Sequence, residues 1–416
     1  MKRTILISLF ACISATVYSA PESAVDTSAL GTAPGSYRIT SKDSVIEIPF
    51  SIFRGDILLQ GGQVNGRPVR MMIDNGFIWD ELMFFGSPAI DSLRLKCEGE
   101  AEISGAPDKE AMKTATASGI TISFPDVEFH DQRAVVTPYT AGLANMWEGT
   151  DGQVSGTFFK HFVVSVDFDR GIMTLTSPDK FRYLGHGAEL AMISLGNGAW
   201  AIPATLQCTD ERKLDINMQM DIGLNDALWA VFDGSHGIGQ PQSAIQASLG
   251  FSVLGEIRGQ VGRVRAVKLG AYTVDSVIAG FMNGEQVEGT NGEVTIGLAL
   301  MSRFNIVFDY PHEKVYIEPN QSFRLPFEYN MSGLTLRRVP GNDNWSSART
   351  VLPQSPADAA GLKAGDTVTT INGQPAGGYD IFALDSLMMR QGTTVSIVVL
   401  RNGQEMPIQI RLKRII

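Results

Sequence analysis

The sequence predicts a mostly β protein in which two similar β-rich lobes precede a smaller α+β domain. From Val45 onward, short strand-like runs alternate with turn signals. Two Asp-x-Gly segments, at Asp74 and Asp221, end apolar runs 147 positions apart, and a similar glycine-bearing segment follows each of them. Such repetition indicates an internal duplication. The composition changes after Pro319, which indicates a third domain.

The bulk composition limits the possible partners. The chain has 416 residues, 44% of them hydrophobic, and a formal net charge of −10. This length suggests two or three domains, and the negative charge argues against a nucleic-acid partner. After the N-terminal region no run reaches the roughly 18 apolar residues of a membrane span. We therefore expect a soluble mature protein without a transmembrane segment.

The first residues have the composition of an export signal. Lys2 and Arg3 precede the apolar run Ile5–Ala15, and small residues follow as far as Ala20, which is signal-peptide order. We predict a signal peptide over residues 1–20 and a periplasmic or secreted protein, with a lipid anchor on Cys12 as the less favoured alternative. Residues 21–44 are rich in Ser, Thr, Ala, Gly and Pro and are predicted to be a flexible leader.

The first lobe is predicted over residues 45–185. The Asn65-Gly66 pair favours a tight hairpin turn, because such turns need positive φ angles, and the returning strand ends at Asp74. Further strands are expected at Ile120–Phe124, Gln132–Val136, Val163–Phe168 and Ile172–Leu175.

The second lobe is predicted over residues 186–320. Short helices are expected at Leu224–Phe232 and Ser243–Ser248. Strands are expected at Trp200–Cys208, Leu214–Asp221, Arg263–Leu269, Asp275–Ala279, Ile306–Phe308 and Val315–Ile317.

A linker is predicted over residues 321–332, followed by a third domain over 333–416. The segment Ser355–Asp366, the strand Thr367–Ile371 and the turn Asn372-Gly373 resemble a PDZ domain of the bacterial type, an α+β partly open barrel. In that family a peptide joins a sheet edge as an extra strand, with its end held by backbone amides. The resemblance implies that Ile381–Met389 is the helix beside the groove. It also implies a receiving strand formed by Gly333, Leu334, Thr335 and Leu336. The alternative is a structural module without a ligand.

The duplicated Asp residues have the pattern of paired acid–base catalysts. Each carboxyl group follows a strand and lies on a tight loop where backbone amides can reach it. If two such loops meet, both carboxyl groups cannot ionise together, so the pair holds one proton. The ionised group can then take a proton from water while the other donates to a carbonyl oxygen, which is a route to amide hydrolysis.

The order of these segments resembles the retropepsin-like aspartic peptidases, with two β-barrel lobes fused in one chain. Gly149–Leu175 and Gly292–Ile317 resemble the two copies of that family's closing segment. The resemblance implies that Asp74 and Asp221 are the catalytic dyad. Loop support would come from Asn75, Gly76, Ile222 and Gly223, and flap-like covers from Ile103–Gly105 and Arg258–Gln260.

The two loops depart from the family pattern at matching positions, both directly after the Asp and, with Phe77 and Leu224, directly after the Gly. The family usually has Thr or Ser after the Asp, and this hydroxyl bonds across to the opposite loop. Here the residues are Asn75 and Ile222. The Asn75 amide can still form such a bond, whereas Ile222 has no side-chain donor or acceptor.

The sequence therefore predicts an exported aspartic endopeptidase whose PDZ module binds polypeptide substrates or unfolded protein ends. The alternative is a catalytically degenerate, aspartic-protease-like peptide-binding protein. No cofactor or metal is expected, since the five His residues include no metal-binding pair. Fusion of the lobes removes the need for a homodimer, so a monomer is expected. Cys97 and Cys208 could pair, but two free thiols are favoured.

Overall fold

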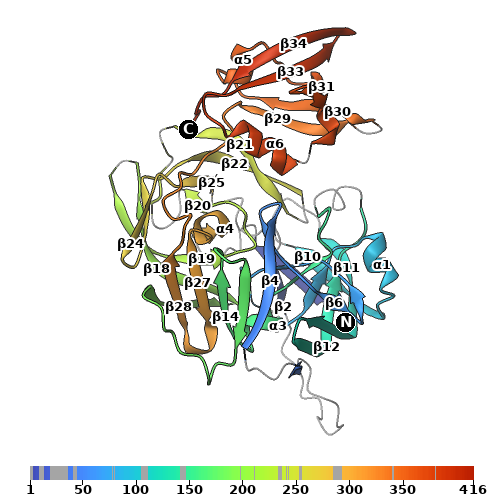
Figure 1. Ribbon diagram of the computed structural model, residues 1–416, viewed down its shortest axis with the longest axis vertical. Helices are drawn as coiled ribbons and strands as arrows, with labels where there is room; N and C mark the ends of the chain where they lie inside the picture. The colour runs from blue at the N-terminus through green and yellow to red at the C-terminus, as the bar shows by residue number, and fades with distance from the viewer. Residues whose placement is uncertain are drawn as a thin grey trace. The chain divides into compact units, whose positions relative to one another are not determined.

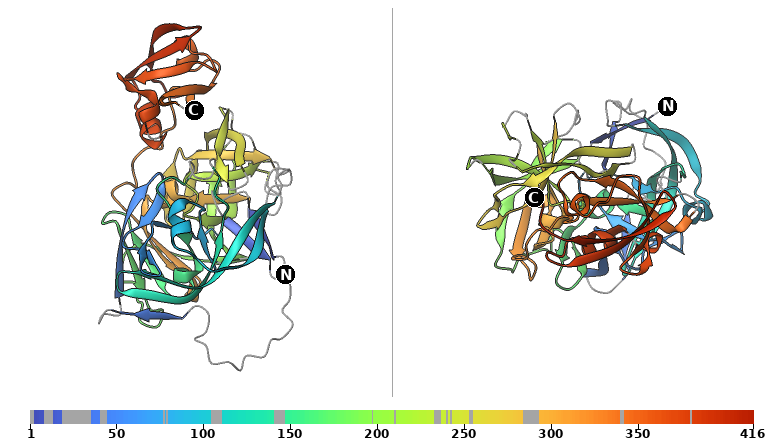
Figure 2. Two further views of the ribbon diagram at one scale, coloured as in Figure 1. Left: turned by 90° about the vertical axis from the view of Figure 1, so that its right-hand side faces the viewer. Right: turned by 90° about the horizontal axis from the view of Figure 1, so that it is seen from above.

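The computed structural model divides into two compact units, Met1–Leu325 and Pro326–Ile416, each considered by itself (Figure 1). Both units consist mainly of β-strands, as the further views in Figure 2 show. The structure describes residues 3–8, 14–18, 36–40, 45–76, 78, 80–104, 111–140, 147–196, 198–209, 211–232, 237–239, 241, 243–252, 255–283, 293–339, 342–379 and 381–416.

The centre of the first lobe is a set of short strands buried on both faces. β8 (Met71–Ile73) pairs in parallel with β13 (Gly152–Val154), which pairs antiparallel with β9 (Leu82–Phe84). β9 in turn pairs in parallel with β12 (Val127–Val136). Every residue of β8, β9 and β13 is buried, as in strands that are covered on both faces. Asp74 follows β8 directly and so leaves the sheet at a carboxyl end.

The second lobe repeats this arrangement of strands. β19 (Lys213–Asp221) pairs in parallel with β26 (Val294–Gly297), and β26 pairs antiparallel with β20 (Leu228–Phe232). β20 pairs in parallel with β25 (Ile278–Asn283). Asp221 at the end of β19 therefore occupies the position that Asp74 has in the first lobe. The duplication seen in the sequence is also a duplication of strand pairing.

One further sheet joins the two lobes. β14 (Val163–Asp167) of the first lobe pairs antiparallel with β27 (Phe304–Asp309) of the second, with Ser165 opposite Val307. The sheet continues outward through β15 (Ile172–Thr176) and β4 (Val45–Phe53) on one side, and through β28 (Lys314–Pro319) and β16 (Ala188–Ala191) on the other. Backbone hydrogen bonds therefore hold the lobes together.

The remaining elements of the first unit extend the two lobes. The strands are β1 (Arg3–Ser8), β2 (Ser14–Tyr18), β3 (Tyr37–Ile39), β5 (Asp56–Leu59), β6 (Gln63–Val64), β7 (Arg67–Pro68), β10 (Cys97–Ser104), β11 (Met112–Phe124), β17 (Ile193–Gly196), β18 (Ala199–Gln207), β21 (Ile245–Ser252), β22 (Gly255–Arg263), β23 (Ala266–Leu269) and β24 (Tyr272–Asp275). The helical turns are α1 (Pro88–Ser92), α3 (Gly156–Phe159), α4 (Leu298–Met301) and η2 (Tyr310–His312).

The predicted hairpin turn is confirmed, and two predicted helices are wrong. Asn65 and Gly66 have φ angles of 50° and 77° between β6 and β7. Leu224–Phe232 instead contains β20, and Ser243–Ser248 overlaps β21. The first four side chains of β20 are buried. Placement between two strands decides the conformation of such a short apolar run, which local spacing alone cannot do.

The N-terminal region contains strands that the sequence did not predict. β3 lies within the predicted leader and pairs antiparallel with β12, and the Tyr37 ring centroid is 4.7 Å from that of Phe162. This aromatic contact anchors a stretch that is otherwise polar. Within residues 1–20, β1 and β2 pair with each other, and β1 pairs in parallel with β10.

The two predicted flap segments have different outcomes. Ile103 lies near the end of β10, which pairs with β11, whereas Gly105 lies outside the described residues. Gly259 pairs with Ala247 in the middle of the β21–β22 hairpin. Arg258–Gln260 is therefore a mid-strand segment and not the tip of a flap, since the small glycine lies within a regular antiparallel pair.

The second unit is a six-stranded sheet with two helices and a 3-10 turn. Its strands run in the order β29-β30-β31-β33-β34, and β32 pairs with β31. The bounds are β29 (Leu334–Val339), β30 (Asn342–Val351), α5 (Pro356–Ala359), β31 (Thr367–Ile371), β32 (Gln374–Pro375), η3 (Ala376–Gly378), α6 (Ile381–Met388), β33 (Thr394–Arg401) and β34 (Gln404–Arg411).

Part of the predicted linker belongs to the core of the second unit. Met331 is 1% exposed and joins the apolar core cluster, and its neighbours Asn330 and Ser332 are also buried. The backbone N–H of Met331 donates to the carbonyl of Met388 at the end of α6, over 2.9 Å. The predicted linker therefore ends before Asn330, and Met331 belongs to the core of the second unit.

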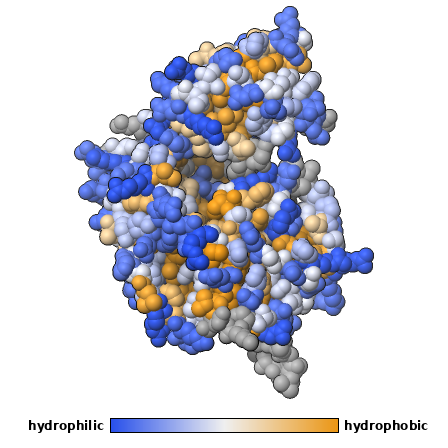
Figure 3. All heavy atoms as spheres, in the orientation of Figure 1, coloured by the Kyte–Doolittle hydropathy of each residue, from blue (hydrophilic) through white to orange (hydrophobic). Residues whose placement is uncertain are grey.

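The surface and the cysteines match an ordinary globular chain. Hydrophilic residues alternate with apolar patches on the face drawn in Figure 3, and exposed apolar side chains include Ile52 and Leu184. Such exposure is normal when it is scattered. Cys97 is exposed and Cys208 is buried, and the structure does not join them in a disulfide. Among the described residues, no helix is long and apolar enough to cross a membrane.

Candidate active site

The two predicted catalytic aspartates come together at the centre of the first unit. Asp74 and Asp221 are 1% and 0% exposed. Gly223 lies directly on Asp74, because a Cβ atom built on this glycine would be 2.6 Å from Asp74 Cγ. Any larger residue at this position would displace the carboxyl group. The glycine of the second Asp-x-Gly loop is therefore required for the loops to approach each other.

Backbone amides of each loop hold its own carboxyl group. Asp74 Oδ1 accepts from the N–H of Gly76 at 2.8 Å, and Asp221 Oδ1 accepts from the N–H of Gly223 at the same distance. The Leu224 N–H also donates to Asp221 Oδ1, at 3.1 Å. These matching bonds fix the orientation of both carboxyl groups. No protein donor among the described residues reaches Asp221 Oδ2.

The cross-link between the loops is one-sided. Asn75 Oδ1 accepts from the backbone N–H of Ile222 at 2.7 Å, and Asn75 Nδ2 donates to the hydroxyl oxygen of Tyr310 at 2.9 Å. The Asn75 amide thus forms the hydrogen bond to the opposite loop that its side chain was expected to be able to form. Ile222 is fully buried and contributes only its backbone. Of the two residues that follow the dyad aspartates, only Asn75 forms side-chain hydrogen bonds across the loops.

The environment of the two carboxyl groups favours a shared proton. Burial raises the pKa of both Asp74 and Asp221, and the charge on Asp74 raises the pKa of Asp221 further. A hydrogen bond between the two side chains lowers the pKa of Asp74 and raises that of Asp221. Two like charges in one buried site cannot both form at low cost. The pair can therefore hold one proton between two carboxyl groups.

Polar side chains that the sequence analysis missed form the floor of the site. Gln153 Nε2 donates to Asp74 Oδ2 at 3.2 Å, and Gln219 Nε2 donates to the carbonyl of Gly76 at 2.9 Å. Both glutamines are 0% exposed. Gln219 lies opposite Thr295 in the β19–β26 register, and Gln153 lies opposite Met72 in β8–β13. A signal was present in the sequence, because a polar residue interrupts each of these apolar runs.

Asp56 places a third carboxyl group in the electrostatic environment of the dyad. Burial, and then the charge of Asp74, raise the pKa of Asp56 to about 7. The Asn225 amide can form hydrogen bonds through both its oxygen and its nitrogen in only one orientation. In that orientation its nitrogen donates to Asp56 Oδ1 at 2.8 Å and to the carbonyl of Gly55 at 3.1 Å. Asn225 follows the second dyad loop. In sequence, Arg54-Gly55-Asp56 has only the pattern of a hairpin turn, so it gave no signal.

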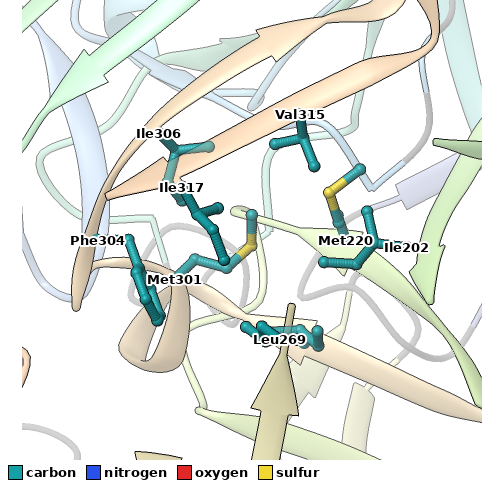
Figure 4. A pocket seen from close by; sticks show the side chains of 9 residues that line it. Ile202, Met220, Leu269, Met301, Phe304, Ile306, Val315 and Ile317 are labelled. Atoms are coloured by element: carbon teal, nitrogen blue, oxygen red, sulfur yellow. The ribbon is translucent and has the colours of Figure 1, made fainter. Parts of the chain in front are cut away.

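A small cavity lies in the core of the second lobe, next to β19. It has a volume of about 10 Å³, and all of its lining side chains are apolar. Figure 4 shows Met220 and Ile202 facing Leu269, Met301 and Ile317 across this space. A void of this size and lining is a packing defect and not a ligand site. Met220 thus faces the apolar core, while its neighbour Asp221 takes part in the polar dyad.

The predicted peptide-binding residues lie at the first strand of the second unit. Gly333 precedes β29, has a φ angle of +71°, and would contact Ser355 if it carried a Cβ atom. Leu334 is buried in the core, Thr335 is exposed, and Leu336 packs against the core while remaining partly exposed. β29 pairs with β30 on one side. Among the described residues no strand pairs with its other side, so β29 is an edge strand of the sheet. The predicted helix is present as α6.

Three comparisons with known proteins bear on these assignments. A family model described as a PDZ domain matches residues 348–401, so the chain contains a PDZ domain. The periplasmic serine endoprotease DegP of Escherichia coli (strain K12) is 33% identical over 64 residues, which are 15% of this chain and 14% of that protein. The same figures hold for DegP of Salmonella typhimurium. The chain thus matches about one seventh of the length of these relatives.

A solved structure, the aspartic proteinase from Irpex lacteus, aligns with 68% of this chain and 99% of its own length, with a TM-score of 0.46 and 11% identity. Among the described residues, no group of three or more His, Cys, Asp or Glu side chains is placed to hold a metal ion.

Proposed function

We propose that this protein is an exported aspartic endopeptidase that hydrolyses peptide bonds with water activated by Asp74 and Asp221. One observation carries the proposal: two buried carboxyl groups, on equivalent loops of two lobes, interact directly and can share one proton. Export is supported by the signal-peptide pattern of residues 1–20.

The chemistry assigns one role to each carboxyl group. The Gln153 amide favours negative charge on Asp74, so Asp74 takes a proton from the bound water while the oxygen of that water attacks the peptide carbonyl carbon. Asp221 gives its proton to the carbonyl oxygen, and a neutral gem-diol forms. When the C–N bond breaks, Asp74 returns a proton to the nitrogen and a gem-diol hydroxyl gives its proton to Asp221. The dyad ends with the single proton with which it began.

The PDZ domain has a separate role in this proposal. An extended polypeptide can pair with the open edge of β29 and place side chains against Leu336 and α6. Such binding would hold an unfolded substrate near the enzyme and raise its effective concentration. The partners are therefore polypeptide substrates, and the mature protein acts as a monomer in the periplasm or outside the cell.

A second function is supported by the one-sided cross-link between the loops. Ile222 contributes no side-chain hydrogen bond, and both carboxyl groups are almost fully buried. A degenerate peptide-binding protein would tolerate these features, whereas a peptidase must open the dyad to its substrate. The two functions differ in what loss of one carboxyl group does.

The test is digestion of a denatured protein by the full-length protein, by Asp74→Asn and by Asp221→Asn. Each substitution removes the shared proton and is expected to lower kcat by at least about a thousandfold. Asp309→Asn is the matched control, because Asp309 is buried as well but pairs with His312. Absence of cleavage by the wild type at every pH would support the degenerate binding protein, and cleavage that persists in both dyad variants would show that Asp74 and Asp221 do not catalyse it. Thermal unfolding of each variant checks that the fold is retained.

A further inference from the structure

The loop before β29 has three backbone N–H groups that are already bonded within the second unit. Ser332 N–H and Gly333 N–H both donate to Asn330 Oδ1, at 2.9 and 3.2 Å. Leu334 N–H donates to Ser332 Oγ at 3.0 Å. Successive N–H groups that converge in this way form a site for an anion, and in PDZ domains the loop at this position holds the end of a peptide by its backbone amides.

Asn330 is fixed firmly in this position. Its Nδ2 donates to the carbonyl of Leu334 at 3.0 Å, and its Oδ1 also accepts from the hydroxyl of Ser332 at 2.6 Å. The residue is only 9% exposed. With four hydrogen bonds, the Asn330 side chain occupies the position that a terminal carboxylate would need.

The backbone around Asn330 is fixed as well. Met331 N–H donates to the carbonyl of Met388, Ala357 N–H donates to that of Ser332, and Leu352 N–H donates to that of Gly333. The loop therefore cannot release its amides without losing contacts to α6, α5 and the β30 end. A peptide carboxylate that entered here would lose its hydration and find its donors occupied, which is unfavourable for a charged group.

We propose that the Asn330 side chain is a plug: it permanently occupies the backbone N–H groups of the loop before β29, where the carboxylate of a peptide would otherwise bind. The PDZ groove then binds internal segments of a polypeptide and not its free C-terminus. The inference rests on the proposed role of this groove in peptide binding. Pairing along the edge of β29 uses backbone groups and requires no chain end. The preferred ligand is then an extended stretch of unfolded chain, which is also the form in which an endopeptidase needs its substrate.

The binding test uses full-length Asp74→Asn protein, so that the probe stays intact. The probe is a fluorescent peptide of about ten residues with alternating valine and threonine, made with a free C-terminal acid or a C-terminal amide. The two forms are expected to bind with affinities within about twofold of each other. Adding Asn330→Ala should make the acid bind at least about tenfold more tightly than the amide. Asn330→Asp keeps an acceptor oxygen in the loop and should show no gain, and Asn344→Ala on the exposed part of β30 is the matched control.

Two results overturn the inference. One is a tenfold preference of the Asp74→Asn protein for the acid. The other comes from amide hydrogen exchange without any peptide: the N–H groups of Ser332 and Gly333, which donate to Asn330 Oδ1, should be protected in the wild type and exchange faster in Asn330→Ala. Rapid exchange in the wild type overturns the plug. If these amides are protected and neither peptide binds, the plug stands and the peptide-binding role of the groove is what fails.

Discussion

The dyad depends on a few side chains whose neighbours differ between the two lobes. Asp74 receives a side-chain amide from Gln153, whereas Asp221 receives a second backbone N–H, that of Leu224. The two halves of the duplication have therefore diverged in the details of the bonds while keeping the same loops. This asymmetry gives the two carboxyl groups different tendencies to ionise, as a pair of acid and base requires.

Asn75 is expected to contribute most to holding the two loops together, through its side-chain hydrogen bonds. Asn75→Ala leaves the buried N–H of Ile222 and the Tyr310 hydroxyl without their partner, so it should lower the free energy of unfolding by about 2 kcal/mol and reduce kcat. Tyr310→Phe removes one of these bonds and should cost about 1 kcal/mol. Asn75→Thr keeps an acceptor for the Ile222 N–H and should recover part of the activity. Urea unfolding and initial rates measure both effects; equal stability of Asn75→Ala and wild type would contradict this role.

At the scale of elements, the sequence predicted strands and repeats better than it predicted their partners. The two Asp loops and the hairpin at Asn65-Gly66 could be placed because local turn chemistry determines them. β20 could not, because its partners β25 and β26 lie far along the chain and a short apolar run takes its conformation from such partners. The role of Tyr310 was missed because its partner is also distant in the chain. Tyr310 lies 235 positions from the Asn75 side chain it bonds, and no sequence pattern links them.

Two leucines of β29, Leu334 and Leu336, differ in how deeply they are buried, and only one of them can report on the groove. Leu334 is 3% exposed and part of the core, whereas Leu336 is partly exposed and packs at its edge. Leu334→Lys would therefore unfold the second unit, since a charge would enter the core, and could not report on binding. Leu336→Lys is the informative change. It should lower affinity for an extended peptide at least about tenfold while changing the free energy of unfolding by about 1 kcal/mol or less.

The control for this change is Met406→Lys, on β34 at the opposite end of the sheet order from β29. Fluorescence anisotropy with the peptide measures affinity, and urea unfolding measures stability. If Leu336→Lys and Met406→Lys bind the peptide with equal affinity, Leu336 does not contact the peptide.

For the molecule as a whole, the site buries several carboxyl groups close together, and burial disfavours their ionised form. Asp56, Asp74, Asp221 and Asp226 all have a raised pKa, chiefly through burial. A carboxyl group whose pKa is raised by folding binds its proton more strongly in the folded state. The folded protein therefore holds more protons than the unfolded chain between pH about 4 and the raised pKa values.

This excess of protons predicts that the protein loses stability as the pH rises from about 4 to about 7. The sign follows from linkage, since stability decreases with pH wherever the folded state binds more protons. Asp226 allows a clean test because its pKa is raised to about 6 and its Oδ2 accepts from Trp229 Nε1, a bond that Asn at this position can also form. Asp226→Asn should leave stability nearly unchanged near pH 4 and raise it by about 3 kcal/mol near pH 7. Urea unfolding of both proteins across this range measures the difference. A difference between wild type and variant that does not change with pH would show that Asp226 is already ionised in the folded protein.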